Sequence, residues 1–320
     1  MNKKPVAMRD ALLERIWKAM EENKKVFFTC ADSGSPILDK IRADYPERFV
    51  NVGIAEQNLI NISAGLALEG YTVFAYAIAP FITMRCYEQT RVSLALLSEI
   101  RPMNVNLIGV GAGYSYVVSG PTHQCYEDLT LMRAMPNFRV LSPSDHVSTA
   151  ALMDICMEKM GPKYLRLDAQ VLPNIYENAD QAVKDGFHVH QQGDKICFIA
   201  TGYMLHTAIQ VANEFKQKDI NIGVIDFIDL YGFEKEKLVN ELRCYKKIIS
   251  MEEGFKGRGG MDALLFDLLG SDQSNPQLIN VGVEGGYRFE LGSRPELHEL
   301  VGIGPLALAN KVKAVLKTLD

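Results

Sequence analysis

The sequence predicts an α/β protein with two three-layer α/β/α domains, each built on a mainly parallel sheet. Short apolar segments alternate with amphipathic ones along nearly the whole chain. Several of the apolar segments carry almost no polar residue, which is typical of strands covered on both faces. The chain has 320 residues, of which 48% are hydrophobic, enough for two sizeable cores. We expect a first domain at residues 1–170, a linker at 171–187 and a second domain at 188–320.

The first domain is expected to alternate helix and strand along its whole length. From Arg9 to Glu22 apolar residues return on one helical face, and Pro80 ends an almost wholly apolar strand. Gly70 suits the end of a helix, and Pro121 suits the first position of another. The expected strands are residues 26–31, 49–52, 71–79, 105–110, 138–141 and 163–167. The expected helices are residues 9–22, 37–44, 55–68, 81–98 and 122–135, with one more beginning at Asp145.

The alternation stops at about residue 168, where polar residues increase and Pro173 interrupts the chain. It resumes after residue 187, with a short strand around His188 and His190. The further strands expected in the second domain are residues 195–200, 222–226, 247–251 and 278–282. The expected helices lie near residues 203–216, 233–243, 259–269 and 304–317. Strands that alternate with helices favour parallel sheets with right-handed crossovers.

Composition excludes several function classes. The net charge of −5 is spread without long runs, so a nucleic-acid surface is not expected. No apolar run is long enough to span a bilayer, and the N-terminus lacks the apolar stretch of a signal peptide. The six cysteines show no CxxC spacing and the six histidines no HxxxH pair, so we expect no metal site on this chain. We therefore expect a cytoplasmic protein.

The stretch from Phe49 to Asn58 organises the first domain. It is predicted to form a short strand, a tight turn at Gly53 and the start of a buried helix, with Glu56 in the first helical turn. A carboxylate there can simply complement the helix dipole. It can also serve a binding site, because ligands of open α/β sheets gather at the carboxyl ends of the strands.

Four loops are expected at those carboxyl ends. They bring a carboxylate, several aromatic rings and a histidine to one edge of the sheet: Asp32, Glu56, Phe81, Tyr87, Tyr114, Tyr116 and His123. A carboxylate beside an aromatic surface suits a heteroaromatic ring, although Phe81 and Tyr87 could equally be core residues. The predicted helix start at Thr122 would place His123 where the helix dipole disfavours an imidazolium.

Three sets of motifs resemble the transketolase family, in the same order and over nearly the whole chain. The first resembles the pyrimidine-binding domain of thiamine-diphosphate enzymes: Asn51-Val-Gly-Ile-Ala-Glu-Gln-Asn58 and Ser63-Ala-Gly-Leu-Ala67. The second resembles transketolase and 1-deoxy-xylulose-5-phosphate synthase: Gly120-Pro-Thr-His-Gln124, Glu127-Asp-Leu129, Met132-Arg-Ala-Met-Pro-Asn137 and Ser142-Pro-Ser-Asp145. The third resembles the transketolase C-terminal domain: Met251-Glu-Glu-Gly254 and Gly292-Ser-Arg294.

The resemblance implies thiamine diphosphate as cofactor and assigns residues to its pyrimidine ring. Glu56 corresponds to the carboxylate that hydrogen-bonds N1′ of the aminopyrimidine, which assists proton removal from the cofactor. Phe81 corresponds to the ring that stacks on the pyrimidine, and Tyr87 follows at the family spacing. Met84 replaces a further family aromatic. Asp32 matches a family aspartate near the cofactor, although it could equally cap the helix that follows.

The resemblance also implies residues that bind substrate. His123 matches the family histidine that contacts the substrate near the reacting carbon. Arg9 and Arg166 match arginines that hold the substrate's terminal phosphate, a role that suits guanidinium groups; without the resemblance both would be surface residues. Ser119 stands where the family has an aspartate, and Gly111 stands where it has a phosphate-binding histidine. We expect these changes to open space and to turn the preference away from the ordinary pentose phosphates.

The motifs cover only the later part of a full transketolase. The family binds the cofactor diphosphate and Mg²⁺ through a Gly-Asp-Gly motif in an earlier domain, and this chain contains no such motif. The resemblance therefore implies the C-terminal subunit of a split transketolase. Its partner would be a separate N-terminal subunit that carries the Gly-Asp-Gly motif and the metal ligands. Two copies of each subunit are the natural symmetric assembly.

Three alternatives remain open at this point. An enzyme like 1-deoxy-xylulose-5-phosphate synthase would use pyruvate, and Arg85 lies near the position of an arginine in that synthase. The β subunit of a 2-oxo-acid dehydrogenase fits poorly, because Gly-Pro-Thr-His-Gln is not its pattern. A catalytically silent scaffold subunit is disfavoured because Glu56, Phe81 and His123 are all present.

Overall fold

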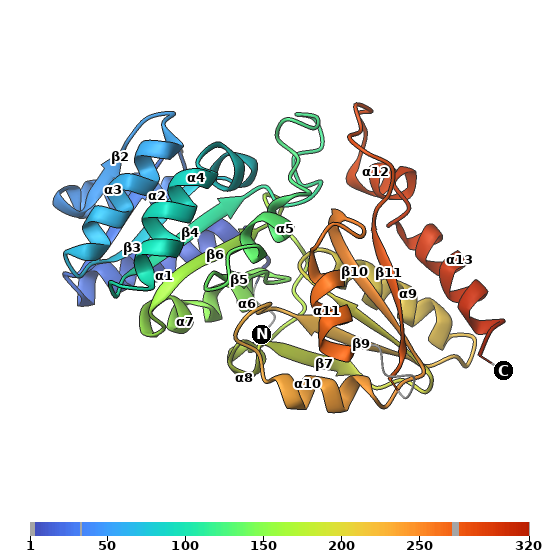
Figure 1. The fold of residues 1–320 in the computed structure, drawn as a ribbon. Helices are drawn as coiled ribbons and strands as arrows, with labels where there is room; N and C mark the ends of the chain where they lie inside the picture. Colours follow the sequence, from blue (N-terminus) through green and yellow to red (C-terminus); the bar gives the residue numbers. More distant parts are fainter. Residues whose placement is uncertain (1–3, 33, 271–274, 320) are drawn as a thin grey trace.

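The computed structural model describes residues 4–32, 34–270 and 275–319. It contains two α/β domains that lie side by side, each with helices packed on both faces of a sheet (Figure 1). The predicted fold class is confirmed. Ser33, which falls in the turn before the second predicted helix, lies outside the described residues.

The first sheet has six strands in the order β2-β1-β3-β4-β6-β5, and every neighbouring pair is parallel. The strands are β1 (Val26–Cys30), β2 (Phe49–Asn51), β3 (Thr72–Ile78), β4 (Asn104–Val110), β5 (Arg139–Leu141) and β6 (Gly161–Leu167). Every residue of β4 is buried, including the polar Asn104 and Asn106, as in a strand covered on both faces. Ile78 pairs with Val110 and Val110 with Leu167, so the carboxyl ends of these strands meet at one edge.

The helices of the first domain are α1 (Met8–Glu22), α2 (Pro36–Asp44), α3 (Glu56–Leu68), α4 (Tyr87–Gln89), α5 (Asp128–Arg133), α6 (His146–Ala151) and α7 (Met153–Glu158). Buried side chains of α1 and α2 pack on one face of the sheet, and those of α3 and α5 pack on the other. Ser35, and not Asp32, caps α2, since its hydroxyl oxygen accepts a hydrogen bond from the Leu38 amide at 3.2 Å.

The second sheet has five strands in the order β11-β10-β8-β9-β7. The strands are β7 (Phe187–Gln191), β8 (Ile196–Ala200), β9 (Ile222–Phe227), β10 (Lys247–Phe255) and β11 (Gln277–Val283). Only the edge strand β7 runs antiparallel to its neighbour among the described strands of this sheet. The helices are α9 (Met204–Lys216), α10 (Lys235–Leu242), α11 (Met261–Leu269), α12 (Arg294–Leu300) and α13 (Pro305–Leu316). Helix α8 (Asp180–Asp185) falls within the segment predicted as a linker.

Two predicted helices of the first domain differ from the structure. The helix expected at 81–98 contains two π-helical segments, Phe81–Arg85 and Thr90–Leu96, on either side of α4. The helix expected at 122–135 contains only α5. Residues before α5 fold back instead, because Cys125 pairs with Gly113 in an antiparallel bridge.

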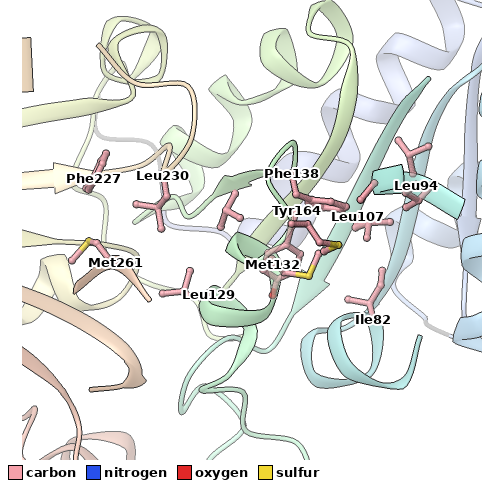
Figure 2. Close-up of a cluster of buried hydrophobic side chains, with 14 of the residues drawn as sticks. Ile82, Leu94, Leu107, Leu129, Met132, Phe138, Tyr164, Phe227, Leu230 and Met261 are labelled. Atoms are coloured by element: carbon pink, nitrogen blue, oxygen red, sulfur yellow. The ribbon is translucent and has the colours of Figure 1, made fainter. Parts of the chain in front are cut away.

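One hydrophobic cluster crosses the boundary between the domains (Figure 2). Leu129 and Met132 of α5 belong to it, together with Phe227 of β9 and Met261 of α11. The two domains therefore share part of their buried apolar surface. Among the described residues, no helix combines the length and the apolar character needed to cross a membrane.

Candidate active site

Glu56 lies at the carboxyl edge of the first sheet, in the first turn of α3, directly after β2. Its side chain is 3% exposed. The predicted start of this helix is confirmed. The loop before it is held by Asn51, whose side-chain oxygen accepts hydrogen bonds from the Asp32 and Gly53 amides at 3.0 Å each. Gly53 adopts a φ of +74°, a conformation that favours glycine and directs the chain into the helix.

Arg85 covers the Glu56 carboxylate. Its Nη1 donates to Glu56 Oε2 at 2.8 Å, and its guanidinium carbon lies 4.4 Å from the centroid of the Phe81 ring. Phe81 and Arg85 are the two ends of the π-helical segment after β3. One guanidinium thus pairs with a buried carboxylate and lies across an aromatic face.

His123 also contacts Phe81. The two rings meet edge to face, with centroids 5.3 Å apart, and the Thr122 hydroxyl lies 3.0 Å from His123 Nδ1. Helix α5 begins only at Asp128, so the prediction that a helix dipole acts on His123 is wrong. The loop after β4 therefore brings His123 to Phe81, and contacts connect Glu56, Arg85, Phe81 and His123 in one cluster.

Tyr116 fills the space beside Gly111. Gly111 has a φ of +106°, and a Cβ at this position would collide with the Tyr116 ring. The expectation that Gly111 opens space is therefore wrong. Tyr116 also faces His123, with ring centroids 6.5 Å apart. Burial raises the pKa of Tyr116, and the positive charge of Arg9 opposes this shift.

Arg166 does not reach a surface. It is 3% exposed, and its Nε donates to Asp128 Oδ2 at 2.7 Å while its Nη2 donates to the Glu253 carbonyl at 3.0 Å. The surface position expected for it without the resemblance is wrong, and the phosphate contact that the resemblance implies stays a prediction. Arg9 is partly exposed and pairs with Asp10 at 2.7 Å.

The remaining predicted residues are Tyr87, Met84, Ser119 and Asp32. Tyr87 is half-buried, and its hydroxyl donates to the Leu131 carbonyl at 3.1 Å. Met84, Ser119 and Asp32 are exposed, and Asp32 has an unusual φ of +43° for a non-glycine residue. Their roles beside the cofactor and the substrate stay predictions.

Sequence reasoning missed a buried charge cluster at the domain boundary. Glu253 of β10 accepts hydrogen bonds from Arg294 Nη2 and His298 Nε2 at 2.6 Å each, and Arg294 Nη1 also pairs with Asp168 at 2.6 Å. Burial alone would raise the pKa of Glu253, but the charges of Arg294 and His298 outweigh it and hold the pKa below its ordinary range. Of these residues, the sequence indicated only Glu253 and Arg294, which lie in the motifs Met251-Glu-Glu-Gly254 and Gly292-Ser-Arg294.

The charge cluster reaches the loop that carries His123. Glu253 Oε1 accepts a hydrogen bond from the Tyr114 amide at 3.3 Å, and the Tyr114 ring meets His298 edge to face. Tyr114 is fully buried, so it belongs to the domain boundary and not to the expected aromatic surface. The second domain thereby fixes the base of the loop after β4.

Two protein families match this chain, and together they cover most of it. Residues 4–174 match the family described as transketolase, pyrimidine binding domain. Residues 186–307 match the transketolase C-terminal domain. The chain belongs to the transketolase family. The resemblance that the motifs indicated is thus confirmed, and Glu56, Phe81 and His123 all lie in the pyrimidine-binding domain.

For some similar transketolases the match covers nearly the whole relative, and for others it covers about half of it. A protein of Actinobacillus succinogenes that is named as one subunit of an apulose-4-phosphate transketolase is 29% identical over 298 residues, which are 92% of this chain and 94% of that protein. Human transketolase is 27% identical over 97% of this chain, but the match spans only 49% of the human protein. A solved structure titled split gene transketolase, inactive beta4 tetramer, has a TM-score of 0.83 and 29% identity, covering 98% of this chain and 99% of that one.

The residues around Glu56 suit one half of the cofactor that transketolases use, namely its aminopyrimidine ring. A buried acceptor beside an aromatic face suits a flat ring with an N–H group, and the Arg85 guanidinium shows that a flat N–H donor fits between Glu56 and Phe81. A diphosphate with a divalent metal needs clustered oxygen ligands. Within the described residues, no group of three or more His, Cys, Asp or Glu side chains could hold a metal ion.

Proposed function

We propose that this chain is the C-terminal subunit of a two-subunit transketolase. The enzyme transfers a two-carbon ketol group from a ketose to an aldose and works in the cytoplasm. The observation that carries the proposal is the cluster of Glu56, Phe81 and His123 at the carboxyl edge of the first sheet. The similarity over nearly the full length to a protein named as a transketolase subunit supports it.

Thiamine diphosphate, when bound, supplies the carbanion chemistry, and the chain orients the ring. The buried Glu56 carboxylate would accept a hydrogen bond from N1′ of the aminopyrimidine once that nitrogen carries a proton, and would thereby favour proton gain by the ring. Phe81 stacks on the ring, and Tyr87, Met84 and Asp32 border its position. His123 faces the Phe81 edge, where it contacts the substrate and moves a proton at the reacting carbon.

The other half of the cofactor site belongs to a partner. We propose a separate N-terminal subunit that carries the Gly-Asp-Gly motif, binds the diphosphate and supplies the Mg²⁺ ligands. Two copies of each subunit form a heterotetramer, because a symmetric assembly lets each cofactor lie between subunits. The first test of this proposal is whether the neighbouring reading frame encodes such a subunit.

The proposed substrate is a sugar phosphate or a similar anionic sugar. Arg9 is partly exposed, and a guanidinium suits phosphate oxygens. The resemblance adds Arg166 as a second phosphate ligand, which would have to leave its buried pairing with Asp128 to reach a substrate. Ser119 and Gly111 lack the charged groups of the ordinary family pattern, and Tyr116 fills the space beside Gly111. The relative from Actinobacillus is named for apulose 4-phosphate, which supports a phosphorylated sugar outside the ordinary pentose pair.

Arg85 favours one alternative, an enzyme like 1-deoxy-xylulose-5-phosphate synthase that takes pyruvate as donor. The Arg85 side chain is 44% exposed beside Glu56, so its guanidinium is accessible to the carboxylate of a substrate bound there. The two functions differ in one product, because only the pyruvate reaction releases CO₂. A donor panel that includes pyruvate therefore distinguishes them.

The decisive experiment combines this chain with its proposed partner, thiamine diphosphate and Mg²⁺. We expect two-carbon transfer from a phosphorylated ketose by the pair, and none by either chain alone. Glu56→Gln keeps the shape of the side chain but removes its charge, so the rate should fall by about two orders of magnitude or more. Glu88→Gln replaces an exposed carboxylate of α4, and as the control it should leave the rate unchanged. Robust turnover by this chain alone, or full activity of Glu56→Gln, would contradict the proposal.

A further inference from the structure

Arg85 makes two contacts with the residues proposed to hold the cofactor ring. Its Nη1 donates to Glu56 Oε2 at 2.8 Å, and its guanidinium carbon lies 4.4 Å from the Phe81 centroid. Glu56 is 3% exposed while Arg85 is 44% exposed, so the guanidinium forms the outer cover of the carboxylate. The carboxylate and the aromatic face are thus both occupied by one side chain of the same chain.

A guanidinium and an aminopyrimidine present similar chemistry to such a pair. Both are flat, both stack on an aromatic ring, and both can donate an N–H to a carboxylate, the aminopyrimidine through its ring nitrogen once that nitrogen is protonated. The Phe81 face turned to Arg85 cannot hold two flat groups at once. We infer that Arg85 occupies the aminopyrimidine position in the unliganded chain and that the cofactor ring must displace it.

This inference rests on the proposed function, because that proposal places the ring between Glu56 and Phe81. It adds a role that the proposal does not contain: the chain carries its own competitor for the cofactor. The ion pair between Arg85 and Glu56 also has an energetic reason in the unliganded chain. Glu56 is buried, and a buried carboxylate without a partner is costly, so Arg85 neutralises it until the ring arrives.

Arg85 can leave without disturbing the core. It is the last residue of the π-helical segment, and Met84 beside it is also exposed. Rotation of the side chain moves the guanidinium into solvent, where it gains hydration in exchange for its ion pair.

The test measures ring binding to the full chain without the partner. The probe is the fragment 4-amino-2,5-dimethylpyrimidine, whose basic ring nitrogen can take up the proton that it donates to Glu56. Its binding is titrated by ligand-observed NMR, so activity is not the readout. Arg85→Ala uncovers both Glu56 and Phe81 and should bind the probe about fivefold more tightly than the unmodified chain, the gain expected from losing one partly exposed ion pair. Arg91→Ala is the matched control. Arg91 belongs to the next helical segment and pairs with Glu88 at 3.1 Å, so its removal should leave probe binding unchanged.

A second readout follows Arg85 itself. Its Nε–H resonance, assigned by its loss in Arg85→Lys, should shift as the probe is added, while the resonance of Arg91 stays in place. Arg85→Ala and Arg91→Ala both replace exposed side chains. Thermal unfolding monitored by circular dichroism checks that the two variants fold.

Each outcome decides between the inference and the function on which it rests. Tighter binding by Arg85→Ala that is lost again in Arg85→Ala/Glu56→Gln supports both. Equal or weaker binding by Arg85→Ala, with Glu56-dependent binding by the unmodified chain, overturns the inference and leaves the cofactor site standing. No binding of the probe by any variant overturns the proposed ring site, and the inference with it.

Discussion

Asp226 and Glu56 are both buried carboxylates, but their surroundings differ. Glu56 has a guanidinium partner, whereas Asp226 Oδ2 accepts hydrogen bonds from the neutral Ser144 and Tyr176 hydroxyls at 2.7 and 2.8 Å. Asp226 Oδ1 has no hydrogen-bond partner among the described residues. Burial therefore raises the pKa of Asp226 from 3.8 to about 7, and the two hydroxyls only partly oppose this shift.

This shift predicts how Asp226 changes stability with pH. Because the folded-state pKa lies above the unfolded value, the contribution of Asp226 is full below about pH 4 and is lost as the pH rises through about 7. Asp226→Asn keeps the shape and removes the charge. It should raise the free energy of unfolding at pH 8 by on the order of 3 kcal/mol relative to the unmodified chain, and leave it nearly unchanged below pH 4. Urea unfolding at several pH values measures this difference.

Asp219→Asn provides the control, because Asp219 is exposed and asparagine tolerates its φ of +58°. Its free energy of unfolding should follow that of the unmodified chain at every pH. A destabilised Asp226→Asn at pH 8 would show instead that the charged form is the one the folded protein prefers.

At the scale of elements, the loop between β4 and α5 matters most for the site. It carries Ser119 and His123, and in Figure 1 it projects beyond the sheet as a green segment. Gly113 fixes the base of this loop. The backbone of Gly113 pairs with Cys125, its φ is +56°, and Glu253 lies against its Cα.

Gly113→Ala should therefore destabilise the protein through two separate effects. The left-handed φ costs about 1 kcal/mol for alanine, and the new Cβ would collide with the Glu253 carboxylate, which Arg294 and His298 hold in place. We expect a total loss of about 2–4 kcal/mol in urea unfolding and faster hydrogen exchange of the Tyr114 amide.

Gly120→Ala separates the two effects. Gly120 also has a positive φ, of +69°, but a Cβ there would meet no atom within 4 Å. It should show only the backbone cost and leave the Tyr114 amide protected. Equal losses in the two variants would mean that Glu253 does not restrain the loop.

The strands and most helices follow from the sequence, because local apolar patterns determine them. The strand, turn and helix that present Glu56 are an example. The helix expected to contain His123 failed because Cys125 pairs with Gly113, a contact that no local pattern reveals. The burial of Arg166 was missed for a related reason: its partners, Asp128 and Glu253, come from distant parts of the chain. The contact between Arg85 and Glu56 joins the end of a π-helical segment to the start of α3 and could not be predicted from either segment alone.

At the scale of the whole molecule, Arg294 connects the two domains. It pairs with Asp168 after β6 and with Glu253 in β10, and its guanidinium lies 3.5 Å from the centroid of the Tyr203 ring. Burial raises the pKa of Asp168, and the charge of Arg294 opposes this rise but does not cancel it, because one guanidinium serves two buried carboxylates.

Arg294→Met leaves Asp168 buried without its cation and leaves Glu253 paired with His298 alone. The free energy of unfolding should fall by about 3–5 kcal/mol at neutral pH, as for other broken buried ion pairs. Because Asp168 then loses its cation partner and can be neutralised only by a proton, the loss should shrink as the pH is lowered toward about 5. Urea unfolding at the two pH values measures this.

Lys256→Met is the matched control for Arg294→Met. Lys256 pairs with Glu284 at 2.6 Å, but both side chains are exposed to solvent, so its removal should cost less than about 1 kcal/mol. A similarly small loss for Arg294→Met would show that the boundary cluster adds little to stability.

The hydrophobic cluster that runs through both domains has a consequence for how such a gene can be divided or recombined. Cutting the coding sequence near residue 187 would leave Leu129 and Met132 on one product and Phe227 and Met261 on the other, each facing water. Each product would expose an apolar surface that only the other product covers, so neither would fold as an independent domain. A chimaera that imports a foreign second domain would inherit the same mismatch unless its helix α11 and strand β9 brought a complementary apolar surface.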